Sequence, residues 1–321
     1  MSKMSTDLVR VALNGPTMGT RWSALLYLPE GTGTAPLSAA LQAAVERVDA
    51  QMSLWRAGSD LNRLNAAPVG EWVALGAEIG EVLHLGLTIG RASGGAFDLT
   101  LGDAVRAWGF GPEGASEAAI GAARTAARRP AWETVELDRA GARARRLAPV
   151  SLDLNGIAKG YGADCLARAL KAAGVTAGLV GIDGEMRALG RRPDGAGWTI
   201  AVEAPEVGRR TPHSMLVLEE AAVATSGDYR HFVEVQGRAL AHTMDPRRGM
   251  PLLAAPASVT VVAQSCAAAD AWATALMVAG PEAGLDLARR AGLEALFLLR
   301  GADGNLAEAR GVGRLFGAAA A

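Results

Sequence analysis

The sequence contains little cysteine, few aromatic residues and almost no net charge. Two cysteines and 5% aromatic residues stand among 321 residues, and the formal net charge is −1. A charge so close to zero argues against a surface that binds polyanions, so we expect no nucleic-acid partner. Cys165 and Cys266 both fall in predicted helices. We expect them to be two buried free thiols rather than a disulfide or a metal-binding pair.

Long apolar runs are also missing. No segment approaches ~18 uninterrupted apolar residues, the length of a membrane-spanning helix. The first 20 residues, MSKMSTDLVRVALNGPTMGT, lack the apolar core of a signal peptide. We therefore expect no membrane segment and a cytoplasmic protein, although a periplasmic chain trimmed of its leader would look the same.

The usual nucleotide-binding motifs are absent, although glycine is abundant at 40 residues. There is no GxxxxGK[ST] loop. The segment GLVGIDG, residues 178–184, resembles a dinucleotide-binding turn only loosely, because the apparent strand continues where a helix should begin. Any phosphate chemistry must therefore use another arrangement of residues.

Helical and strand patterns are mixed along the chain without regular βα alternation, which favours an α+β fold. We expect one domain, residues 1–321, with mixed, largely antiparallel sheets and packed helices in two intimate lobes. Ile157, Tyr161, Cys165, Ala169 and Ala173 form an apolar stripe that predicts a helix packed by one face, starting just after a strand that ends at Asp153. Helices are expected at 37–55, 77–93, 155–174, 266–280 and 282–292, and hairpins with turns at Gly15-Pro16 and at 191–197.

Asp270 and Thr274 are the first candidates for chemistry. They lie four residues apart on a predicted helix, so their side chains share a face. A carboxylate and a hydroxyl oxygen together suit a hard cation such as Mg²⁺. The alternative is an ordinary apolar helix whose aspartate lies near the N-terminus and interacts favourably with the helix dipole.

Two glycine-containing segments carry further acidic and basic residues. In SLDLNGIAKG, residues 151–160, Asp153 and Lys159 flank glycines that permit close backbone approach, and Lys159 can reach a phosphate or an acid. The alternative there is a helix cap followed by a solvated lysine. In GGAFDLTLGDAVRAWGFG, residues 94–111, Asp98 lies beside glycine-rich backbone, where the alternative is a simple turn and core.

His242 begins the segment HTMDPRRGMP, residues 242–251. Asp245 and Pro246 predict a turn, because proline fixes φ and aspartate can accept hydrogen bonds from nearby backbone N–H groups. His242 is then either a polar residue beside this turn or a group that accepts a proton in catalysis.

Seven segments in order resemble the FAD:protein FMN transferase family, also called ApbE, and the resemblance extends from about residue 15 to residue 280. The segments are PTMGTRW, MSLWRAGSDLNRLN, GGAFDLTLGDAVRAWGFG, SLDLNGIAKGYGADCLARAL, AVATSGDYRHF, HTMDPRRGMP and SVTVVAQSCAAADAWATALMVAG. The resemblance implies an ApbE-like fold, related to the T-fold. It also implies a Mg²⁺-dependent enzyme that binds FAD and cleaves its pyrophosphate. Such an enzyme transfers FMN to a Thr or Ser hydroxyl of an acceptor protein and releases AMP.

The resemblance also assigns site residues, and these assignments are expectations. His242 would be the base, Asp270 would act in catalysis and in metal binding, and Ser226 would lie close to the phosphates. The metal would be bound by Asp270, Thr274 and the backbone carbonyl of Gly156, with Ala273 in the same turn. The FAD site would be lined by Met18, Trp55, Ala96, Phe97, Asp98, Asp153, Lys159 and Met244.

Some residues depart from the family pattern. Trp55 stands where tyrosine is common, and GIDGEM places Asp183 and Glu185 where glycine and aspartate are usual. His84, His213 and His231 are expected to be structural. Two alternatives remain open: a hydrolase that converts FAD to FMN and AMP, and a non-catalytic protein that binds or delivers FAD. The chain is compatible with a monomer or a homodimer.

Overall fold

The computed structural model describes residues 8–206, 211–228, 232–235, 238–253, 255–301 and 306–317. The helices are α1 Ala35–Met52, α2 Asp60–Ala66, α3 Ala77–Ala92, α4 Gly102–Ala107, α5 Glu117–Thr125, α6 Ala131–Thr134, α7 Ala158–Ala172, α8 Cys266–Ala279 and α9 Pro281–Arg290. The strands are β1 Leu8–Thr17, β2 Thr20–Pro29, β3 Val73–Ala74, β4 Val135–Asp138, β5 Arg143–Arg146, β6 Gly178–Ile182, β7 Glu185–Leu189, β8 Trp198–Glu203, β9 Pro212–Leu218, β10 Ala222–Gly227, β11 Phe232–Val235, β12 Arg238–Ala241, β13 Met244–Asp245, β14 Met250–Pro251, β15 Ser258–Ala263, β16 Glu294–Arg300 and β17 Leu306–Val312.

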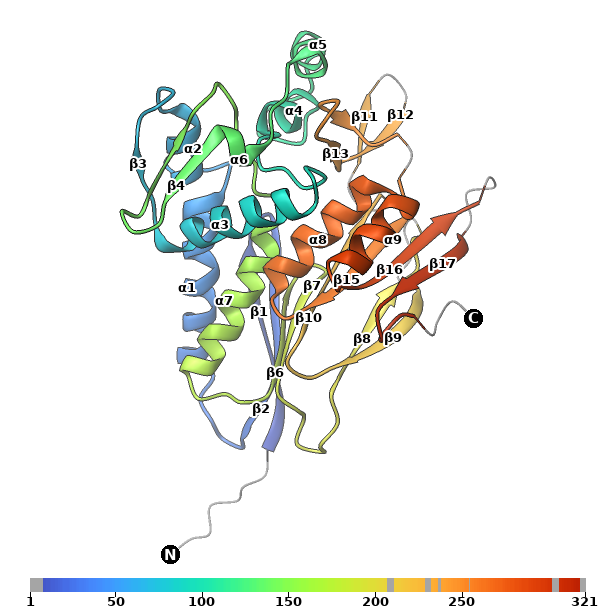
Figure 1. Ribbon diagram of the computed structural model, residues 1–321. Helices are drawn as coiled ribbons and strands as arrows, with labels where there is room; N and C mark the ends of the chain where they lie inside the picture. Colours follow the sequence, from blue (N-terminus) through green and yellow to red (C-terminus); the bar gives the residue numbers. More distant parts are fainter. Residues whose placement is uncertain are drawn as a thin grey trace, which may run out of the picture.

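A large sheet forms the centre of the fold (Figure 1). Within the described residues its strand order is β1-β2-β6-β7-β10-β15-β16-β17, and its neighbouring strands pair antiparallel. Smaller sheets are formed by β3-β5-β4, β8-β9, β11-β12 and β13-β14. This arrangement confirms the expected α+β class with largely antiparallel sheets.

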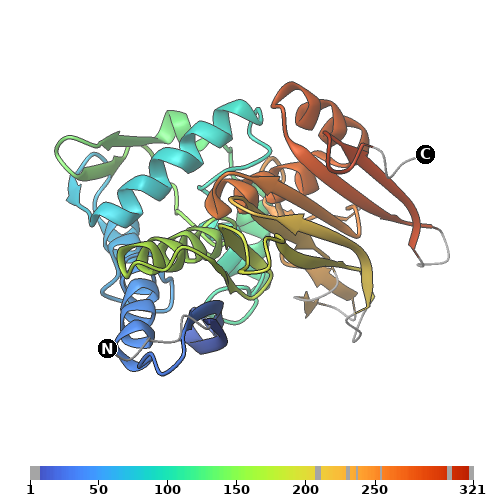
Figure 2. The same cartoon turned by 90° about the horizontal axis from the view of Figure 1, so that it is seen from below.

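Helices cover one face of the central sheet. α7 packs on β6 and β7, α8 packs on β10 and β15, and the two helices contact each other. They lie side by side in the views of Figures 1 and 2. The hairpin β8-β9 packs on the opposite face, where Trp198, Ile200 and Leu216 join a buried cluster with Val223 and Leu296 of the central sheet. The sheet is therefore covered on both sides.

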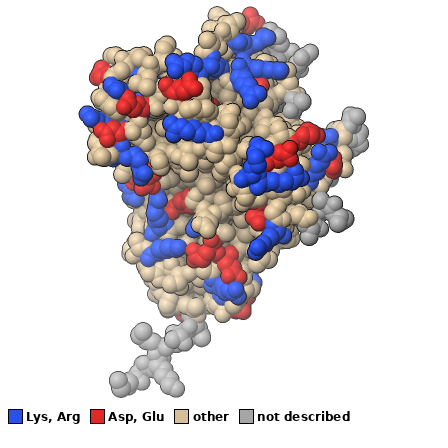
Figure 3. All heavy atoms as spheres, viewed as in Figure 1, with Lys and Arg blue, Asp and Glu red and all other residues tan. Residues whose placement is uncertain are grey.

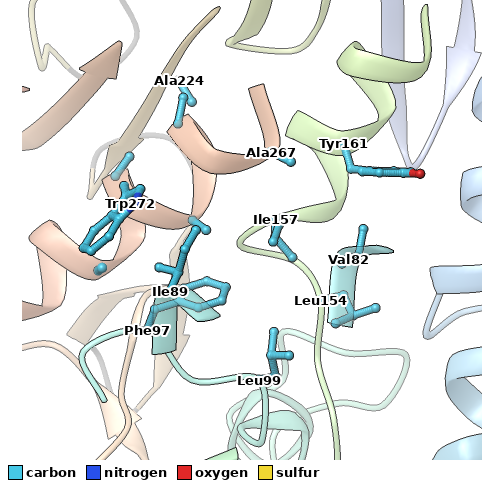
Figure 4. Close-up of a cluster of buried hydrophobic side chains, with 14 of the residues drawn as sticks. Val82, Ile89, Phe97, Leu99, Leu154, Ile157, Tyr161, Ala224, Ala267 and Trp272 are labelled. Carbon is cyan, nitrogen blue, oxygen red and sulfur yellow. The ribbon is translucent and has the colours of Figure 1, made fainter. Parts of the chain in front are cut away.

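The largest apolar core lies between the helices and the irregular segments around residue 97. Phe97, Ile157 and Trp272 belong to it, although they come from distant parts of the chain. Figure 4 shows their side chains in one cluster with Ile89 and Leu99. Burial of these large side chains stabilises the segments that carry Asp98 and Asp153, each next to a core residue.

The two cysteines are buried free thiols, as the sequence predicts. Cys165 lies in α7 and Cys266 is the first residue of α8. On the face shown in Figure 3, acidic and basic side chains are interspersed. None of the described helices is both long and apolar enough to cross a membrane.

The opening hairpin is present, but its turn was predicted at the wrong place. Gly15 and Pro16 lie within β1, and the chain reverses at Met18 and Gly19, whose φ angles are 46° and 71°. In the described part of the chain β1 is an edge strand, where proline is tolerated because no neighbouring strand there requires its missing N–H. Met18 is thereby placed at the tip of the hairpin.

A second hairpin also differs from the expectation. The segment 191–197 does not join a paired hairpin, because β7 belongs to the central sheet and β8 pairs with β9. The tight turn lies instead at Asp183 and Gly184, between β6 and β7. Asp183 has a φ of 55°, and Asp-Gly is a favoured sequence for a two-residue hairpin turn.

Two expectations around Asp153 are also corrected. Asp153 does not end a strand: the segment is bound instead by a hydrogen bond from the Asp153 N–H to the Leu99 carbonyl. α7 is buried on more than one face, since Ala163, Leu166 and Leu170 are buried beside the predicted stripe, while Ala173 is exposed. The helix lies between α1, α8 and the central sheet, which explains this wider burial.

Gly160 permits the close crossing of α7 and α8. A methyl group at Gly160 would clash with the Cys266 carbonyl and lie 2.8 Å from Cβ of Asp270. We expect Gly160→Ala to lower the free energy of unfolding by about 1–3 kcal/mol, the usual cost of overpacking. Gly121→Ala in α5 is the control, because no atom lies within 4 Å of the added methyl group. Urea denaturation should show no loss of stability in the control, and equal stability of both variants would contradict the packing argument.

Candidate active site

A cavity of about 1180 Å³ lies where the segments singled out in the sequence meet. All the predicted site residues border it except Ala273, which is fully buried in the core. Ser226, the residue expected near the phosphates, also borders it. The predicted residues that line the cavity are Met18, Trp55, Ala96, Phe97, Asp98, Asp153, Gly156, Lys159, His242, Met244, Asp270 and Thr274.

Residues from three parts of the chain meet at the cavity wall. Asp270 and Thr274 lie one turn apart on α8, and the Thr274 hydroxyl is 3.2 Å from the Ser226 hydroxyl at the end of β10. Gly156 is adjacent, since a methyl group there would lie 3.1 Å from Oγ1 of Thr274. The fold therefore brings together the three residues that the sequence analysis proposed as metal ligands.

Asp270 is fixed by α7. Its Oδ2 accepts a hydrogen bond of 3.0 Å from the backbone N–H of Gly160. Burial raises the pKa of the Asp270 carboxyl, and the nearby Glu185 carboxylate raises it further, while Lys159 opposes this rise. A buried carboxylate beside a second carboxylate is stabilised by any cation that binds between or next to them.

Lys159 lies between acidic side chains. Its Nζ is 2.9 Å from Oε1 of Glu185 and 3.8 Å from Oδ2 of Asp183. Burial alone lowers the pKa of Lys159, but Glu185, Asp270 and Asp183 outweigh this effect and raise it. The lysine is therefore held in its charged form at the cavity wall.

Asp98 and Asp153 differ in how much of their carboxylate the protein itself uses. Oδ1 of Asp98 accepts hydrogen bonds from the backbone N–H and hydroxyl of Thr100, and Oδ2 accepts one from the N–H of Ala131 at the start of α6. Burial raises the pKa of Asp98 against these hydrogen bonds. Among the described residues, Asp153 accepts hydrogen bonds only from the backbone and side-chain N–H groups of Asn155. Asp98 thus supports the loop, whereas Asp153 retains more capacity to bind a ligand.

His242 lies just before a turn that the sequence predicted correctly. The side chain of Asp245 accepts a hydrogen bond from the N–H group of Arg247, and the carbonyl of Asp245 accepts one from the N–H group of Gly249. The His242 ring packs edge-on against Phe110, with 6.4 Å between the ring centres. The ring lines the cavity while the turn fixes the backbone after it.

The turn itself is anchored to α4 and its flanking residues. The indole N–H of Trp108 donates to the Gly249 carbonyl at 3.0 Å. Gly249 has a φ of 59°, and a methyl group there would clash with the Ala123 carbonyl and the Arg128 guanidinium. Only glycine meets both requirements. The other histidines lie elsewhere: His84 and His213 are exposed, and His231 lies outside the described residues.

Apolar residues form the remaining walls. Met18 extends from the β1-β2 turn over α7, and a methyl group at Gly162 would lie 3.2 Å from its Cε. Phe97 and Met244 are buried, whereas Trp55 is 69% exposed. A large exposed aromatic ring at a cavity suits stacking against a planar ligand.

Several residues that line the cavity were not predicted from the sequence. Glu185 and Asp183 were noted only as departures from a family pattern, yet both contact Lys159. Residues 199–203 of β8 also border the cavity. They carry no motif, and only the chain path brings them there. The Asp-Gly turn signal at 183–184 could have identified the β6-β7 hairpin.

The cavity has an excess of acidic groups. Seven carboxylate side chains line it, against the two cations Arg56 and Lys159. Oε2 of Glu185 is buried and has no hydrogen-bond partner among the described residues. No cluster of three or more His, Cys, Asp or Glu residues suited to a metal occurs in the described part of the chain. Mg²⁺ does not require such a cluster, because it is commonly bound by one or two carboxylates together with substrate phosphates. The residues present therefore fit a cation that binds together with an anionic ligand.

The carboxyl group of Asp153 is expected to make the free energy of unfolding depend on pH. Burial raises its pKa to about 6, so its contribution to stability is fully present below pH ~4 and is lost as the pH rises through 6. We expect Asp153→Asn to raise the free energy of unfolding at pH 8 by about 1–3 kcal/mol, and this gain should vanish near pH 4. Urea denaturation at both pH values measures it. A variant less stable than the parent at pH 8 would show that the carboxylate stabilises the fold.

Comparisons with known proteins identify the family of this chain. The ApbE family model matches residues 18–297. The FAD:protein FMN transferase of Vibrio cholerae serotype O1 is 35% identical over 298 residues, which cover 92% of this chain and 89% of the relative. That of Haemophilus influenzae is 33% identical over 305 residues, which cover 92% and 88%.

A solved structure extends the likeness to the fold. The apo form of the flavinyl transferase ApbE from Pseudomonas stutzeri matches with a TM-score of 0.83 at 38% sequence identity. The match covers 97% of this chain and 98% of that chain. The resemblance carried by the seven sequence segments is confirmed.

Proposed function

The chain belongs to the ApbE family, and we propose that it transfers FMN from FAD to a Thr or Ser hydroxyl of an acceptor protein, with Mg²⁺, and releases AMP. One observation carries this proposal furthest. Asp270, Thr274, Gly156 and Lys159 line one cavity, which is large enough for a dinucleotide and is acidic. An acidic cavity binds a pyrophosphate well only when a cation accompanies it.

FAD would lie along the cavity, with its ring system and its pyrophosphate in different environments. The exposed ring of Trp55 offers a stacking surface, and Met18, Phe97 and Met244 offer apolar walls. Asp153 would accept hydrogen bonds from the ligand's donors. The pyrophosphate would lie near Lys159, whose charge is held in place by Glu185.

Asp270, Thr274 and the Gly156 carbonyl would bind Mg²⁺. When bound, the ion supplies Lewis-acid stabilisation of the charge that develops on the pyrophosphate oxygens. Gly160 orients the Asp270 carboxylate through its N–H, and Ser226 orients the Thr274 hydroxyl. Lys159 contributes a fixed positive charge on the α7 side.

The transfer requires removal of a proton from an alcohol that is a weak nucleophile at neutral pH. His242 would accept that proton as the acceptor oxygen attacks the FMN phosphorus. The new oxygen–phosphorus bond would form while the bond between the FMN phosphorus and the oxygen that bridges the two phosphates breaks, and AMP would leave with that oxygen and the electron pair. Positioning and electrostatic stabilisation then account for most of the catalysis, as in other phosphoryl transfers.

Product analysis tests this function against its alternatives. The purified chain is incubated with FAD and Mg²⁺, with and without an acceptor protein, and AMP and free FMN are quantified by chromatography. We expect AMP in the presence of acceptor without an equal amount of free FMN. Equal amounts of free FMN and AMP in both reactions would identify a hydrolase, and intact FAD in both would identify a binding protein.

A further inference from the structure

β8 borders the cavity with its edge rather than with one of its faces. Five consecutive residues, Thr199 to Glu203, line the cavity. Their side chains alternate: Ile200 and Val202 are buried against the central sheet, whereas Thr199 and Ala201 are exposed. Successive side chains of a strand point to opposite faces, so consecutive residues can all border one space only along the strand's backbone edge.

Along residues 198–202 that edge has no strand partner within the described part of the chain. There β8 pairs with β9, and no other backbone hydrogen bond joins residues 198–202 to another described element. In an antiparallel pair, alternate residues direct their N–H and C=O groups away from the partner strand. β8 therefore presents a row of backbone donors and acceptors to the cavity.

The proposed reaction needs such a surface. A Thr or Ser hydroxyl is separated from the main chain by only one carbon atom, so it reaches the bound pyrophosphate only if the acceptor's backbone enters the mouth of the cavity. A main chain brought there must exchange its hydrogen bonds with water for others. An open strand edge supplies these bonds without requiring particular side chains.

We propose that an extended segment of the acceptor protein adds to the free edge of β8 as a third strand beside β8 and β9. This inference rests on the proposed function, and it names how that function's protein substrate is held. Alternate side chains of the added strand point to the inner side of this three-stranded sheet. One of these side chains is the receiving Thr or Ser.

Hydrogen–deuterium exchange tests the proposal directly. The probe is an acceptor protein that the unaltered chain flavinylates, with its receiving Thr or Ser changed to Ala so that it docks without reacting. In the presence of FAD and Mg²⁺, the acceptor should slow exchange in residues 198–203 by about 10-fold or more at the amides that gain a partner. Exchange in β9 should not change. FAD and Mg²⁺ without acceptor are the control.

Two matched variants separate edge docking from docking on the hairpin's outer face. Ala201 and Met215 are cross-strand partners on that face, but only Ala201 lies on the strand that borders the cavity. Ala201→Glu should raise the KM for the acceptor about 10-fold, which equals 1.4 kcal/mol of binding energy. Met215→Glu should leave it unchanged. FAD affinity, measured in both variants, reveals any defect of the cavity itself.

Three results would overturn the proposal. The first is a complex with the acceptor that leaves exchange in residues 198–203 unaltered. The second is an equal rise in KM in both variants, which would assign docking to the outer face. The third is a chain that releases AMP but flavinylates no protein, which would overturn the proposed function and this inference with it.

Discussion

Asp270→Asn is expected to lower the rate of FMN transfer at least about 10³-fold, which corresponds to about 4 kcal/mol of transition-state stabilisation. The reason is the loss of the carboxylate charge that would bind Mg²⁺. Asparagine keeps an oxygen that can accept the hydrogen bond from the Gly160 N–H, so the contact between α7 and α8 is preserved. The rate of AMP release at saturating FAD measures the effect.

Asp286→Asn is the matched control for Asp270. Asp286 is an exposed residue of α9 that pairs with Arg289 and does not border the cavity. Its replacement should leave the rate unchanged. Transfer by the Asp270 variant at the parental rate, or full activity of the parent in EDTA, would show that Asp270 and Thr274 are merely structural.

His242→Ala is expected to lower transfer about 10²–10⁴-fold, the usual contribution of general acid–base catalysis. FAD binding should be retained, because proton removal matters mainly in the transition state. If His242 is instead a structural residue beside the 245–249 turn, the opposite result is expected. Its removal would then lower the melting temperature but leave turnover per folded molecule unchanged.

His84→Ala provides the comparison for His242. His84 is exposed on α3 and lies away from the cavity. Melting temperature, FAD affinity and AMP release are measured for both variants. A folded His242 variant with near-parental AMP release would mean that another group accepts the proton.

The sequence predicted which residues line the cavity better than it predicted the chain path. The predicted ligands Asp270 and Thr274 share one helix, so their spacing alone places them together. Their approach to Gly156 depends on Gly160, which permits α7 and α8 to cross closely, and no local pattern encodes that crossing. The seven family segments supplied this information instead, because they imply a known arrangement.

The turns were harder to predict, for a physical reason. Gly15-Pro16 is a typical turn sequence, but Pro16 lies in an edge strand and the chain reverses at Met18, which adopts a φ normally left to glycine. The Asp183-Gly184 turn carries a recognisable signal that was read only as a departure from the family pattern. That departure has a structural role, since Glu185 pairs with Lys159 at 2.9 Å.

β8 could not be assigned to the site from sequence. Its alternation of buried and exposed residues predicts a strand with one face on a core. Which edge of that strand remains unpaired depends on how the β8-β9 hairpin packs on the central sheet, and this is a property of the tertiary structure.

The most direct test of the proposed function is the intact mass of an acceptor protein after incubation with the chain, FAD and Mg²⁺. The proposal predicts a mass increase equal to one FMN minus water on a Thr or Ser. The increase should require both FAD and Mg²⁺ and be accompanied by one AMP for each acceptor modified. An acceptor of unchanged mass, in a reaction that nevertheless consumes FAD, would contradict it.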